Sequence, residues 1–175
     1  LPPEWAGEIY CTVIHACHAL GDLHRMRAWT DATEQWGEQF VGDAVYAGIC
    51  RIHRLQLLSI EGGWDTAEPA IAQSGAELVG RNNWVAGEAY YQLGEIRRLR
   101  GDSGGAEKAF ARARELGTEP QPGASLLQHA AGQNEAAWAG LCEAGARKYR
   151  KTRDPADLAA AEGSCRQALG LNAGL

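Results

Sequence analysis

The feature that most constrains the fold of this chain is a glycine-containing break that recurs at nearly constant spacing. Gly21, Gly62 and Gly101 lie 41 and 39 residues apart, and the stretches around them carry apolar residues at helical spacing. Glycine at such a break supplies the left-handed conformation that ends a helix. A repeat of about 40 residues, each containing a pair of helices, is typical of a helical solenoid in which every pair stacks on its neighbours.

No segment of the chain shows the alternation of polar and apolar residues that marks a strand, so we predict an all-α fold. We expect a solenoid of about four to five helix pairs, forming a single domain over residues 1–175. The expected hairpins and the final helix span approximately 4–38, 44–79, 83–116, 123–151 and 155–171. A short loop is predicted at residues 41–44. Pro69 is placed in the first turn of the fourth helix, where its missing N–H has no intrahelical partner.

Composition narrows the possible classes of function. The chain is 45% hydrophobic and 22% charged, which is typical of a folded domain. Its net charge of -5 argues against a dedicated nucleic-acid binder, because phosphate contacts need a clustered positive surface. The sequence contains no signal-peptide pattern and no apolar run long enough to cross a membrane. We therefore expect no direct nucleic-acid contact and no membrane contact.

The cysteines indicate a compartment. They are odd in number and form no C-x-x-C pair; they are Cys11, Cys17, Cys50, Cys142 and Cys165. This pattern is not typical of a disulfide framework and favours a reducing cytoplasm. On apolar helix faces such residues usually behave as small hydrophobic side chains.

The best-formed hairpin, residues 86–120, has small and large side chains at fixed offsets. These residues are Tyr90, Leu93, Gly94, Ala106, Phe110 and Ala113. In this arrangement the hairpin resembles a tetratricopeptide repeat. The resemblance implies that Gly94 and Ala106 lie where two helices meet closely, and that Phe110 fills the space between hairpins.

A longer stretch, about residues 4–132, resembles the helical repeat region of actinobacterial LuxR-type multidomain transcription regulators. The resemblance is carried by WAGEIYCTVIHACHAL, GGWDTAEPAIAQS and the 86–120 hairpin. In that family the region accompanies an ATP-binding or cyclase-like module and a C-terminal DNA-binding domain. This chain has neither a G-x-x-x-x-G-K-[ST] motif nor a recognisable helix-turn-helix. The resemblance implies a non-catalytic binding or scaffold module, the protein- or ligand-sensing region of a bacterial transcription regulator.

In repeats of this type the first helix of each pair lines a concave face, and Gly94 sets the register. The register predicts a polar groove that binds a protein, a peptide or a small-molecule effector. The predicted groove residues are Glu8, Cys11, Thr12, His15, His18, His53, Gln56, Ser59, Glu88, Tyr91, Gln92, Glu95 and Arg98. The alternative interpretation is a solvated inner face with incidental polar residues.

Other functions for the same residues stay open. Cys11, His15 and His18 are spaced i, i+4 and i+7, and with His53 they could ligate zinc. The sequence lacks an H-E-x-x-H pattern, so we expect no metal and no cofactor. A stand-alone small-molecule sensor or metal-dependent pocket using His15, His18 and His53 is one alternative function. A homodimerising scaffold is another. No Ser-His-Asp arrangement indicates catalysis, so we expect no enzyme activity.

Two further features have structural explanations. The basic run over residues 147–153 could contact phosphate or an acidic partner, but cations at a helix C-terminus also favour the helix dipole. Trp5, Trp64 and Trp84 lie near helix starts, and we expect them to pack between hairpins. An exposed tryptophan would instead mark a binding hot spot.

Overall fold

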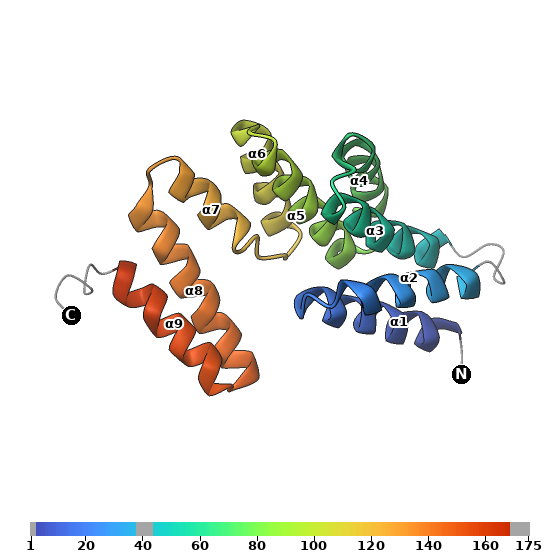
Figure 1. Cartoon of the computed structure of the whole chain (residues 1–175), viewed down its shortest axis with the longest axis horizontal. Coiled ribbons are helices and arrows are strands. Elements are labelled where there is room, and N and C mark those ends of the chain that lie inside the picture. The colour runs from blue at the N-terminus through green and yellow to red at the C-terminus, as the bar shows by residue number, and fades with distance from the viewer. Residues whose placement is uncertain (1–2, 38–43, 169–175) are drawn as a thin grey trace. The chain divides into compact units, whose positions relative to one another are not determined.

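The computed structural model describes residues 3–37 and 44–168, and these residues are organised as helices joined by short turns (Figure 1). The side chains of Glu8 and Cys50 lie outside the described set. The same holds for residues 38–43, which include most of the predicted loop, and for residues 169–171 of the predicted final helix.

The helices follow one another in the order expected from the sequence. Their bounds are α1 (Pro3–Ala19), α2 (Leu23–Gly37), α3 (Ala44–Ile60), α4 (Trp64–Leu78), α5 (Asn83–Leu99), α6 (Ser103–Glu115), α7 (Gly123–Ala130), α8 (Asn134–Thr152) and α9 (Pro155–Ala168). The described ranges contain no strand, so the all-α prediction is confirmed. Within these ranges no helix is both long and apolar enough to cross a bilayer. The repeat solenoid stays a prediction.

The turns after α1, α3 and α5 share one hydrogen-bond pattern. Each contains a glycine with positive φ: 69° at Gly21, 86° at Gly62 and 83° at Gly101. The N–H of the next residue then reaches a carbonyl of the preceding helix at 2.9 Å, from Asp22 to Cys17, from Gly63 to Leu58 and from Asp102 to Arg97. This Schellman cap satisfies carbonyls that a helix end leaves without an intrahelical partner.

Two aspartates that follow these glycines start the next helix. The carboxylate of Asp22 accepts the N–H of Arg25 at 3.0 Å, and that of Asp102 accepts the N–H of Gly105 at 2.9 Å. These are N-cap hydrogen bonds, each of which stabilises a helix by about 1 kcal/mol. One helix therefore ends and the next begins within two residues.

The start of α4 corrects the prediction for Pro69. Trp64 is the first residue of this helix, and its indole Nε1 donates to the carbonyl of Ser59 at 2.8 Å. Because the helix begins earlier than predicted, Pro69 lies in the second turn rather than the first. At that position the ring removes one helical hydrogen bond.

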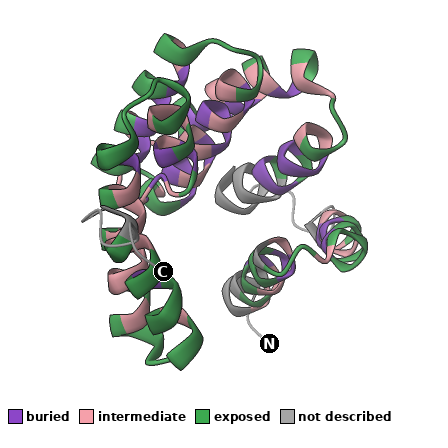
Figure 2. Ribbon diagram, turned by 60° about the vertical axis from the view of Figure 1, so that its left-hand side comes forward, coloured by how far each residue is buried: buried purple, intermediate pink, exposed green. Residues whose placement is uncertain are grey.

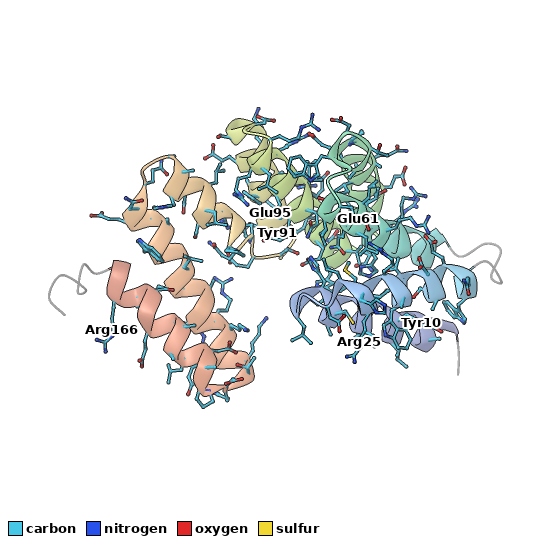
Figure 3. The ribbon with its side chains drawn as sticks, viewed as in Figure 1. Tyr10, Arg25, Glu61, Tyr91, Glu95 and Arg166 are labelled. Carbon is cyan, nitrogen blue, oxygen red and sulfur yellow. A yellow bond between two sulfur atoms is a disulfide. The ribbon has the colours of Figure 1, made fainter. Side chains whose placement is uncertain are left out.

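The chain divides into two compact units, residues 1–93 and 94–175, and the division falls within α5. One core cluster of the first unit consists of buried side chains from α1, α2 and α3: Ile14, Cys17, Met26 and Leu57. Tyr10, labelled in Figure 3, packs between α1 and α2, with its ring centroid 5.8 Å from that of Trp29 and 5.6 Å from that of Trp36. The first two helices are thus held by both aliphatic and aromatic contacts.

The second unit contains α6 and the part of α5 from Gly94 onward, which make up most of the hairpin that resembles a tetratricopeptide repeat, and Phe110 lies at the centre of their packing. This side chain is 2% exposed. A Cβ at Gly94 or at Gly123 would overlap the Phe110 ring, so both glycines are needed for the close approach of α5 and α7 to α6. Ala106 and Ala113 are fully buried on the same helix. This is the packing expected of Gly94 and Phe110.

The last two helices, α8 and α9, form an antiparallel pair (Figure 1) whose contact is made by small side chains. A Cβ at Gly145 would lie 3.0 Å from the Cα of Ala161, so the two backbones approach closely. Most of α9 is exposed (Figure 2). An ion pair of 2.7 Å between Lys148 and Asp157 adds to this contact.

A disulfide between Cys142 and Cys165 links α8 to α9. The expectation that the cysteines stay unpaired is therefore wrong for these two residues. Their Cα atoms are 4.7 Å apart, within bridging distance, because the close packing of α8 on α9 brings them together. Cys11 and Cys17 are buried and form no disulfide with another described residue, as expected of cysteines that act as small hydrophobic side chains. The cysteines as a set no longer favour a reducing compartment.

The close contact at Gly94 predicts opposite effects of two alanine substitutions. Gly94→Ala should lower the free energy of unfolding by about 1–3 kcal/mol, because its Cβ overlaps the buried Phe110 ring. Gly104→Ala, in the exposed first turn of α6, should raise it by about 0.5–1 kcal/mol, because nothing lies near its Cβ and glycine is a poor helix former. Urea unfolding followed by circular dichroism measures both. Equal effects of the two variants would contradict the packing.

The disulfide predicts a stability that depends on reductant. It closes a loop with a sequence separation of 23 residues, and cross-linking a loop of this length stabilises a fold by about 3 kcal/mol. Dithiothreitol should therefore lower the unfolding midpoint of the wild-type chain. The double variant Cys142→Ala/Cys165→Ala is the control and should not respond. A wild-type chain that does not respond would show that the link contributes nothing.

Candidate functional site

The first unit brings several of the predicted groove residues together. His15 and His18 lie on α1, and His53 and Gln56 lie on α3. His15 is exposed, His18 is half-buried, and His53 is only 6% exposed. The cluster therefore extends from the surface into the interior.

His53 is the buried end of this cluster. Its Nδ1 lies 3.2 Å from Oε1 of Gln56, a buried residue on the same helix, and this contact orients the ring. The second ring nitrogen, Nε2, is buried and has no hydrogen-bond partner among the described residues. A neutral imidazole has one donor and one acceptor nitrogen, so half of its hydrogen-bonding capacity is unused.

The pKa values of His18 and His53 are both lowered from the ordinary value. Burial lowers the pKa of His53, the Gln56 hydrogen bond partly opposes this, and the nearby His15 and His18 lower it further. Burial likewise lowers the pKa of His18, and His15 adds to the effect. Both causes disfavour the charged form. At neutral pH the His18 and His53 rings are therefore neutral, and each offers one donor and one acceptor nitrogen.

An exposed aromatic residue adjoins the cluster. Trp84, near the start of α5, is 50% exposed, and its ring meets that of His15 edge-on with centroids 5.8 Å apart. Trp84 meets the expectation of packing between hairpins only in part, because its ring contacts His15 of α1 while half of its surface is left to solvent. Trp84, Glu88 and Tyr91 are spaced i, i+4 and i+7 on one helix face. That spacing is the sequence signal that could have grouped Trp84 with the predicted groove residues.

We call His15, His18, His53 and Trp84 the imidazole–tryptophan surface. The remaining predicted residues of the first unit differ from it in burial. Cys11 is buried in the interior, Thr12 is exposed, and Gln92 is buried. Glu88 and Tyr91 are half-buried on α5, and Ser59 contributes its carbonyl to the Trp64 indole.

Glu95 and Arg98 belong to the second unit and bind one another. The Arg98 guanidinium donates from Nε to Glu95 Oε1 at 3.0 Å and from Nη2 to Oε2 at 2.9 Å. Both side chains are half-buried on α5, where Glu95 is labelled in Figure 3. The Arg98 guanidinium and the Glu95 carboxylate thus form a bidentate ion pair within α5.

The described residues do not support the metal alternative. No group of three or more His, Cys, Asp or Glu side chains among them is placed to hold a metal ion. Cys11 lies in the buried interior, whereas His15 is exposed. The i, i+4, i+7 spacing places the residues on one side of α1 but does not make their ligand atoms converge.

The basic run at the end of α8 is engaged within its own unit. Arg147 binds Glu119 at 2.6 Å and Glu143 at 3.1 Å, and Lys148 binds Asp157. The Arg153 guanidinium lies 5.9 Å from the centroid of the Tyr149 ring. These contacts give much of the run a structural role in the second unit.

Comparisons with known proteins add no relatives. No family model matches the chain, no curated protein matches it, and no solved structure matches it. The function of the site is therefore inferred from the geometry of the described residues.

The lowered pKa values predict a stability that falls on acidification. The unfolded chain binds protons at the ordinary histidine pKa of about 6.5, whereas folded His18 and His53 bind them only at lower pH. Their contribution is fully present above the unfolded pKa and is lost as the pH falls from there through the folded pKa values. Urea unfolding at pH 7.5 and at lower pH values should show this loss.

The variant His53→Gln serves to assign the effect. This variant lacks the buried His53 imidazole. Its free energy of unfolding should therefore decline less than that of the wild type as the pH is lowered from 7.5. Identical declines in the two proteins would show that carboxylates elsewhere, and not this cluster, cause the pH dependence.

Proposed function

We propose that this chain is a non-catalytic recognition module that binds a peptide segment of a protein partner on the imidazole–tryptophan surface. The observation that carries the proposal is the half-exposed Trp84 ring set edge-on against His15. Tryptophan is strongly enriched among the residues that dominate binding energy at interfaces. An aromatic ring beside imidazoles offers apolar contact together with polar ring nitrogens.

Rigidity supports this assignment. Trp84 contacts His15 of α1, and α1 is packed on the core of the first unit through Ile14 and Cys17. Side chains held in place lose little conformational entropy on binding, which favours affinity. A peptide with an apolar anchor would pack on the indole, and its backbone amides would meet the imidazole nitrogens.

The wider role follows from the resemblance to the repeat regions of LuxR-type transcription regulators. In that role the chain would be the sensing segment, resembling tetratricopeptide repeats, of a bacterial cytoplasmic regulator, and DNA binding would reside in another module. The coding sequence on either side of residues 1–175 tests this part. A flanking nucleotide-binding or helix-turn-helix segment would support the regulator role, and flanking sequence of an unrelated class would contradict it.

Selection of peptides tests the recognition function directly. A random peptide library panned on the whole chain should yield binders, and Trp84→Ala should weaken their binding by about 30-fold or more, equivalent to about 2 kcal/mol. Isothermal titration calorimetry measures the affinities. Circular dichroism melting curves establish that each variant is folded.

Trp29 provides the matched control. It is another partly exposed tryptophan, 39% exposed, on α2, and its ring packs against that of Tyr10. Trp29→Ala should leave the affinity of the selected peptides within about twofold of wild type. Failure to enrich any peptide, or equal loss of affinity in both variants, would refute the assigned surface.

A further inference from the structure

The second unit contains a polar pocket that shares no residue with the imidazole–tryptophan surface. It has a volume of about 380 Å³ and lies among α6, the turn at residues 116–122, α7 and α8. Its polar lining consists of Arg114, Glu119, Gln121, Gln128, Glu143 and Arg147. Small-molecule sites in proteins begin at about 300 Å³, so the space suits a small ligand.

One wall of the pocket presents two carboxylates that bind the same guanidinium. Arg147 donates to Glu119 Oε2 at 2.6 Å and to Glu143 Oε1 at 3.1 Å, so a single guanidinium holds both groups. Each carboxylate has about four acceptor sites, and one hydrogen bond uses only part of them. Two negative charges against one positive charge leave this wall acidic, which favours a cationic group.

A buried amide oxygen near this wall also favours a ligand group that donates hydrogen bonds. The Gln121 side-chain oxygen Oε1 is buried and has no hydrogen-bond partner among the described residues. Gly140 makes room beside this amide, because a Cβ there would lie 2.9 Å from Gln121 Nε2 and 2.8 Å from Ser125 Oγ. A buried amide oxygen without a donor is costly, so an N–H group arriving there is favoured.

The pocket also offers a positive group with no acidic partner. Arg114 lines it from α6, is exposed, and forms no ion pair with any described residue. Arg112 on the same helix, in contrast, binds Glu115 at 2.7 Å. An exposed guanidinium without an acidic partner can bind the carboxylate of a ligand through two parallel hydrogen bonds.

We propose that this pocket binds a free α-amino acid. Its ammonium group would lie against Glu119, Glu143 and the Gln121 oxygen, and its carboxylate would bind Arg114. The walls formed by Ala124, Ala136 and Ala144 leave room for the ligand's side chain, and the Gln128 amide favours a polar one. The site goes beyond the peptide-binding function and does not depend on it.

Calorimetric titration of the whole chain with a panel of common free amino acids tests the proposal. At least one member should bind, and its N-acetyl derivative and its methyl ester, which lack the ammonium and carboxylate charges respectively, should each bind about tenfold more weakly or worse. Absence of binding across the panel would overturn the proposal. Equal binding of the parent amino acid and both derivatives would also overturn it.

Variants assign the binding to this pocket. Arg114→Gln should lower the affinity for the free amino acid about tenfold. It should also abolish the preference for the free carboxylate over the methyl ester. Lys108→Gln, an exposed cation on the same helix outside the pocket, is the matched control and should change neither. Gly140→Ala should also weaken binding, because its Cβ intrudes on Gln121. Binding that Arg114→Gln and Gly140→Ala both leave intact would place the ligand elsewhere and refute the site.

Discussion

The glycine cap that ends α1, α3 and α5 is the interaction on which the arrangement of this chain depends. Each of these helices is 17 residues long, and each ends at a glycine whose positive φ closes the same backbone hydrogen bond. A side chain at those positions would be strained, so the length of the helix and the direction of the chain are fixed together. The cap therefore sets the direction in which the chain leaves each of these helices and enters the next one.

Helix existence and helix bounds could be predicted because they depend on local chemistry. The glycine breaks, the aspartate caps and the apolar spacing all act within a few residues, and they agree with one another. The resemblance to a tetratricopeptide repeat implied a small residue at Gly94 and a space-filling ring at Phe110, and the structure packs these two residues against each other. Pro69 was misplaced because the cap at Gly62 and the Trp64 indole start α4 earlier than its apolar pattern suggests.

The candidate site was predictable only in part, because exposure and pairing are set by tertiary contacts. The register correctly placed His15, His18, His53 and Gln56 near one another, but it included Cys11, which is buried, and left out Trp84, which is half exposed. No local signal distinguishes a tryptophan that packs between helices from one that rests against a histidine. The Cys142–Cys165 link likewise depends on how α9 lies on α8, and the cysteine count alone argued against it.

Both units bury polar atoms that have no hydrogen-bond partner among the described residues, and this links their two proposed sites. His53 Nε2 is such an atom in the first unit, and Gln121 Oε1 is one in the second. A buried polar atom left unsatisfied costs about 1–3 kcal/mol, a large fraction of the net stability of a small domain. Thr30 and Thr33, buried on α2, avoid this cost because each donates to a carbonyl of its own helix, whereas the buried hydroxyls of Ser74, Thr118 and Ser125 have no partner among the described residues. Gln121 differs from these hydroxyls because its side chain lines the polar pocket of the second unit, where an arriving N–H group would offset the cost that its Oε1 carries.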